Sequence, residues 1–73
     1  MPSPRETIAL ASFDAVTRAM LLAIFDDVWA SCEDHSELMA YRIAGNIIDA
    51  ARAGQRSKEA IHRFAADAAA CHN

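Results

Sequence analysis

The first half of the chain carries a broad arc of apolar side chains. At 100° per residue on a helix, the apolar positions between residues 8 and 32 cover roughly 200°, about twice the stripe that packing on one side requires. The larger members of this arc are Leu10, Phe13, Val16, Met20, Leu21, Leu22, Ile24, Phe25, Val28, Trp29 and Cys32. Asp26 and Glu33 mark the opposite, solvated side. A helix that is apolar over so wide an arc needs neighbours on two sides.

The start of this helix is sharply marked, whereas its continuity is open. Residues 3–6, Ser-Pro-Arg-Glu, match a capping box with proline where its missing N–H costs nothing. A continuous helix over residues 4–32 would be about 43 Å long, whereas a compact chain of 73 residues is about 29 Å across. We expect the continuous helix, with one end projecting toward another chain. The alternative is a break, with Ser12 as a second cap.

Two shorter helices are predicted over residues 37–53 and 58–70. The first has a clean apolar stripe at helical spacing, formed by Met39, Ala40, Ile43, Ala44, Ile47, Ile48, Ala50 and Ala51. The second is expected to turn inward Ile61, Phe64, Ala65 and Ala68. The expected caps are Asp34 or Ser36 before the first helix, Gly54 after it and Ser57 before the second.

These elements predict an all-α fold in one domain that spans residues 1–73. The architecture is a three-helix bundle in which the long first helix packs against a helix-turn-helix hairpin. A chain this short buries only about 60% of its unfolded surface. Its hydrophobic content of 53% is rich in alanine, which adds little burial per residue. Dimerisation is a common way for such a chain to gain core.

Part of the wide arc is therefore expected to meet a second copy in a homodimer. Two short helices cover about half of an arc of roughly 200°, and the remainder would be a large exposed apolar patch. The residues expected at this interface are Phe13, Val16, Met20, Phe25 and Trp29. Rotating the arc by about 60° exchanges Met20 for Phe25 at the seam, so the pattern leaves open which edge faces the partner.

The charge pattern argues against general affinity for nucleic acid or for an anionic membrane. The net charge is −3, with seven acids and two bases in residues 1–41 and three acids and five bases in residues 42–73. The apolar run over residues 19–25 is far shorter than the ~20 residues that a bilayer requires. The first residues lack the pattern of a signal peptide, so the expected location is the cytoplasm. The partner expected besides a second copy is another protein.

A resemblance to a known class of proteins is carried by the second half of the chain. The matching segments are Arg42-Ile43-Ala44, Ile47-Ile48, Ala51-Arg52-Ala53-Gly54-Gln55-Arg56-Ser57 and Ala60-Ile61. They resemble small uncharacterised helical proteins of proteobacteria, in which a helix ends at glycine, a polar turn follows and a short helix closes the chain. Lys58 stands where many of those proteins carry proline. The resemblance implies no activity and no functional residue.

The hairpin invites an alternative function, that of a small DNA-binding regulator. Its basic corner, within residues 52–63, comprises Arg52, Arg56, Lys58 and Arg63. Against this interpretation, the last helix is rich in alanine with few base-reading groups, and the protein is acidic. A solvated αα-hairpin explains the same residues.

Candidate metal ligands are Cys32, His35, Cys71 and His72, which an up-down-up bundle would bring to one pole. Cys32 and His35 form only half of a zinc motif, and the adjacent pair Cys71 and His72 chelates poorly, so no metal and no cofactor is predicted. A Cys32–Cys71 disulfide is equally disfavoured.

No catalytic pattern stands out in the sequence. The chain has no glycine-rich phosphate loop, no plausible Ser-His-Asp set and no zincin motif. The paired acids Asp26-Asp27 and Glu33-Asp34 point about 100° apart on a helix and form no carboxylate dyad. The sequence therefore predicts a non-enzymatic helical protein that acts as a homodimer or as a protein-interaction module.

Overall fold

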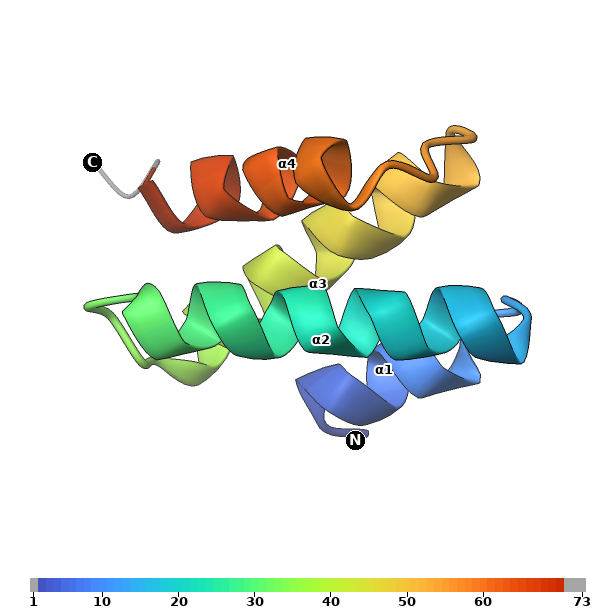
Figure 1. Ribbon diagram of the computed structural model, residues 1–73. Helices are drawn as coiled ribbons and strands as arrows, with labels where there is room; N and C mark the ends of the chain where they lie inside the picture. The colour runs from blue at the N-terminus through green and yellow to red at the C-terminus, as the bar shows by residue number, and fades with distance from the viewer. Residues whose placement is uncertain (1, 71–73) are drawn as a thin grey trace.

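Four helices make up the computed structural model, which describes residues 2–70 (Figure 1). They are α1 (Pro4–Leu10), α2 (Ala15–Ser31), α3 (Glu37–Arg52) and α4 (Lys58–Ala70). The described part of the chain contains no strand, so the all-α prediction is confirmed. The predicted count of three helices is wrong, because the long first helix is divided into α1 and α2.

The chain leaves the helical conformation between α1 and α2. Ala11 is extended, with φ −67° and ψ 146°, and Asp14 then caps α2 by accepting a hydrogen bond from the amide of Thr17 at 3.3 Å. The Thr17 side chain and amide both donate to this carboxylate, which lowers the pKa of Asp14. The continuous helix over residues 4–32 was therefore a wrong prediction, and Asp14 caps α2 in place of Ser12. The turn folds α1 back onto the bundle, where Ile8 becomes fully buried.

The two longest helices form the centre of the bundle. Both α2 and α3 pack against all three other helices, whereas α1 and α4 do not touch each other. Figure 1 shows α1 on one side of α2 and α4 on the other, with α3 crossing behind. The result is compact, with a radius of gyration of 11.0 Å. One long face of α2 is left without a neighbouring helix within residues 2–70.

The apolar stripe of α3 is buried in the core, as predicted. Its buried residues are Met39, Ala40, Ile43, Ala44, Ile47, Ile48, Ala50 and Ala51. The Ser36 hydroxyl caps its start by accepting from the amide of Met39 at 3.2 Å. At its other end Gly54 has a positive φ of 99°, the left-handed conformation that glycine adopts without strain. Local chemistry therefore specifies both ends of this helix.

The crossing of α3 and α4 corrects one predicted core position. Ile61 and Ala65 are fully buried, as expected, but Phe64 is 48% exposed. Its backbone carbonyl accepts a hydrogen bond from the Asn46 side chain at 3.0 Å, which records a close approach of the two helices. The small side chain of Ala65 permits this approach of α3 and α4. The bulky side chain of Phe64 is then left at the edge of the contact between the two helices.

No helix within the described residues is both long enough and apolar enough to cross a membrane.

Candidate interaction surface

One side of α2 is exposed along its length and is not covered by another described helix. Its exposed residues, called the outer face below, are Ala15, Val16, Ala19, Ala23, Asp26, Asp27, Ala30 and Ser31. Val16, Ala23 and Ala30 recur every seventh residue, with Ala19 and Asp26 between them, which is the a/d spacing of a helix that packs against another helix. Four of these five positions are apolar. The surface therefore has the pattern of a helix-packing stripe.

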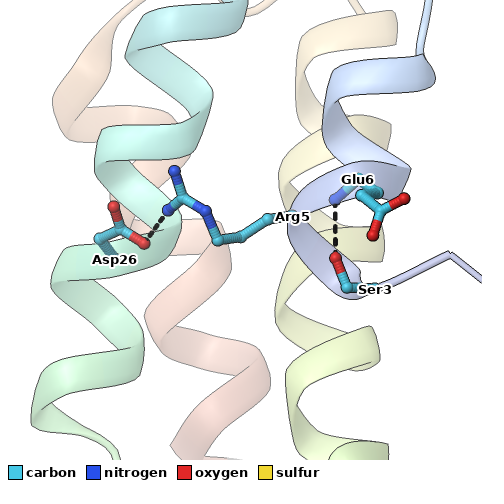
Figure 2. Close-up of polar contacts among 4 residues, drawn as sticks. All are labelled: Ser3, Arg5, Glu6 and Asp26. Atoms are coloured by element: carbon cyan, nitrogen blue, oxygen red, sulfur yellow. Dashed lines mark hydrogen bonds and ion pairs between the residues drawn. The ribbon is translucent and has the colours of Figure 1, made fainter.

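The acidic position within this stripe is neutralised from the neighbouring helix. Figure 2 shows Arg5 extending from α1 to form an ion pair with Asp26 on α2. Close to it, the Ser3 hydroxyl caps α1 by accepting from the amide of Glu6 at 3.2 Å, as the sequence predicted (Figure 2). The two side chains of the ion pair are about half exposed, so the pair adds little to stability. Its consequence is electrostatic, because it balances the charge of Asp26 and leaves Asp27 as the charged acid of the outer face.

The structure distributes the five predicted interface residues among different surroundings. Val16 is 80% exposed and belongs to the outer face, whereas Phe25 is 4% exposed and lies in the core. The expectation that Phe25 faces a partner is therefore wrong. Phe13, Met20 and Trp29 are half-buried at the margins of the helix.

Two of these marginal aromatic residues already have partners within the chain. The Arg56 guanidinium lies over the Phe13 ring, 5.8 Å from its centroid. Trp29 stacks on Phe25 with ring centroids 6.1 Å apart and contacts the ring of His35 at 4.5 Å. These contacts hold Phe13 and Trp29 against their own chain.

Sequence reasoning missed the alanines of the outer face as interface candidates. It weighed side chains by size, and Ala19, Ala23 and Ala30 are small. The available signal was their spacing from Val16, at intervals of three and four residues, because small residues at such spacing let two helix backbones approach closely.

The basic corner is only partly available to an external ligand. Arg52, Lys58 and Arg63 are exposed. Arg56 instead donates to the carbonyl oxygen of Ala51 at 2.6 Å and to that of Gln55 at 2.8 Å. Arg56 thereby satisfies the C-terminal end of α3. The corner is thus three solvated bases around one structural arginine.

Acids also accompany the bases on α4. Glu59 lies in the first turn, where its own backbone amide and the Ser57 hydroxyl lower its pKa. Asp67 is exposed farther along the same helix, beyond Arg63. The exposed side of α4 therefore presents mixed charge rather than a basic stripe.

Of the candidate metal ligands, Cys32 and His35 lie within the described residues. The buried Cys32 donates its thiol to the carbonyl of Asp34 at 3.1 Å, and the His35 Nε2 lies 2.8 Å from the carbonyl of Trp29. Both side chains thus contact the backbone. Cys71 and His72 lie outside the described residues. Within residues 2–70 no three His, Cys, Asp or Glu side chains are placed to hold a metal ion.

A broad open hollow lies at this pole between the end of α2 and α4. Its volume is about 570 Å³, and it is lined by Val28, Ser31, Cys32, Glu33, Asp34, His62, Ala66 and Ala69. A smaller hollow of about 290 Å³ lies between α3 and α4 beside Phe64. The lining of the first hollow includes the Cys32 thiol, the His62 ring and two carboxylates, but the thiol donates to the backbone carbonyl of Asp34.

The resemblance to small proteobacterial helical proteins stays a prediction. No protein-family model, no curated protein and no solved structure matches this chain.

Proposed function

We propose that this protein acts by association rather than by catalysis, as a homodimeric helical interaction module. The observation that carries the proposal is the outer face of α2, which is mostly apolar, regularly spaced and uncovered by the other described helices. Surface helices of single-chain proteins ordinarily present a polar face to water. In α2 the inward side is buried and the outward side is mostly alanine and valine.

The physical driving force for association is the removal of this face from water. Burying apolar surface is worth roughly 25 cal/mol per Å², and alanines allow two helix axes to approach to the lower end of the usual range of about 8–10 Å. The stripe itself is narrow. A specific interface of about 1,200 Å² in total therefore also has to include the half-buried margins of α2, such as Met20 and Leu22.

Placing a charge at the centre of the outer face should abolish association. Ala23→Arg puts a long cation where a second helix would lie, whereas Ala9→Arg adds the same charge at an exposed position on α1. In sedimentation equilibrium at micromolar concentration we expect the wild type and Ala9→Arg at about twice 7.9 kDa, and Ala23→Arg at 7.9 kDa. All three should show the same helical circular dichroism spectrum.

A wild-type mass of 7.9 kDa at every concentration would overturn the proposal. A dimer that Ala23→Arg leaves intact would show that another surface carries the association.

The alternative function is a small DNA-binding regulator that uses the exposed bases Arg52, Lys58 and Arg63. The salt dependence of binding distinguishes DNA binding from the proposed association, because binding through phosphate contacts weakens steeply as the salt concentration rises. We expect the wild type to pass through a heparin column at about 0.15 M salt. At that concentration exposed charges more than about 8 Å apart are largely screened from each other. If the wild type is retained and a variant with all three bases replaced by alanine is not, the result would favour the DNA-binding alternative.

A further inference from the structure

Given the association proposed above, on which this step rests, we infer that the partner of the outer face is a second copy in antiparallel orientation. The two-fold axis passes close to Ala23. The inference is carried by the order of side-chain sizes along the outer face and by the uneven placement of charge along α2.

Ala23 is the midpoint of the exposed stripe. An antiparallel pair centred there places Val16 of one copy opposite Ala30 of the other, and Ala19 opposite Asp27. Val16, the largest side chain of the stripe, then meets the small Ala30 at both ends of the contact. The two helix axes are therefore a similar distance apart at the two ends. A parallel pair would set Val16 against Val16 and Ala30 against Ala30, which would splay one end.

The charge along α2 distinguishes the two orientations more strongly. After the capping Asp14, residues 15–25 contain no acid and one base, Arg18, whereas Asp26 and Asp27 are followed by the exposed acids Glu33 and Asp34. A parallel pair would bring this acidic end against its own copy, and like charges across an interface are unfavourable.

In the antiparallel pair the acidic end lies beside the first half of the partner helix. Asp27 then lies opposite Ala19 of the partner helix rather than opposite its own copy. Arg5 already neutralises Asp26, so Asp27 is the acid whose repulsion the antiparallel placement relieves. Charge therefore favours the same orientation as side-chain size.

Single cysteines on the outer face test the orientation directly. In a background with Cys32→Ala and Cys71→Ala, the variants Val16→Cys, Ala23→Cys and Ala30→Cys are each oxidised by air with copper phenanthroline. A disulfide requires Cα atoms within about 7 Å, so only a residue near the two-fold axis links to its own copy. Ala9→Cys, which is exposed on α1, serves as the matched control.

We expect Ala23→Cys alone to give a dimer band on a non-reducing gel. An equimolar mixture of Val16→Cys and Ala30→Cys should give the mixed dimer, whereas each of these alone and Ala9→Cys should remain monomeric. Self-linked dimers of both Val16→Cys and Ala30→Cys would overturn the antiparallel orientation and leave the proposed association standing. Failure of every outer-face variant to cross-link, with a dimeric mass in sedimentation, would overturn the inference by placing the contact elsewhere. A monomeric wild type would overturn both proposals.

Discussion

Ile47→Asp should unfold the protein at room temperature. Ile47 has no exposed surface and lies midway along α3, the helix that packs against all three others. Burying an unpaired carboxylate costs several kcal/mol, and the lost aliphatic packing adds to that cost. A chain of this length has a total stability of roughly 4–11 kcal/mol. The substitution therefore removes most or all of the free energy of unfolding.

Far-UV circular dichroism during heating measures this loss. Leu38→Asp is the matched control, because it makes the same kind of replacement on the same helix at a side chain that is 69% exposed. That position lies in the first turn of α3, where an added acid is favourable to the helix dipole. We expect the control to melt at or slightly above the wild-type temperature. A cooperative wild-type melt for Ile47→Asp would show that this face of α3 is not the core.

Ile8→Ala should cost about 2–5 kcal/mol, the range for a large aliphatic side chain removed from a core. Ile8 is the buried residue of α1, a helix of seven residues that packs against both α2 and α3. A helix this short is unstable without tertiary packing. Losing its anchor should release α1 from the bundle and expose the surfaces of α2 and α3 beneath it.

Urea unfolding and amide hydrogen exchange together check this prediction. Leu10→Ala is the control, because Leu10 is 73% exposed at the end of the same helix. We expect it to change the free energy of unfolding by less than about 0.5 kcal/mol, as surface substitutions usually do. Ile8→Ala should also abolish exchange protection in α1 while α3 keeps part of its own. A larger loss of stability for Leu10→Ala than for Ile8→Ala would contradict the observed packing.

The ends and the buried stripe of α3 were predictable because they depend on neighbours in sequence. A hydroxyl at Ser36 bonds an amide three residues away, and Gly54 adopts a conformation that few other residues tolerate. The eight buried residues of α3 lie on one side of that helix, and the exposed Arg42, Asp49 and Arg52 mark the other. Only one way of turning the helix toward a core was therefore available.

The candidate interaction surface was predictable only in outline. The wide arc on α2 indicated that one side would lack an internal partner, which matches the uncovered outer face. It did not indicate which side, because Phe25 and Val16 are both apolar and their exchange leaves the pattern unchanged. The structure buries Phe25 and exposes Val16 because α1 and α4 flank α2 and α3 crosses behind it, which leaves uncovered only the side that carries Val16.

By itself the sequence determined the helical class, the caps of α1 and α3 and the stripe of α3, since each arises from contacts within a few residues. Only the tertiary structure decided the division of the first helix and the orientation of α2. Residues 4–31 form two helices because a single one would extend beyond a bundle of this size, whereas a turn at residues 11–14 allows Ile8 to be buried. That gain depends on helices distant in the sequence, so the cap at Asp14 permits the break but does not decide it.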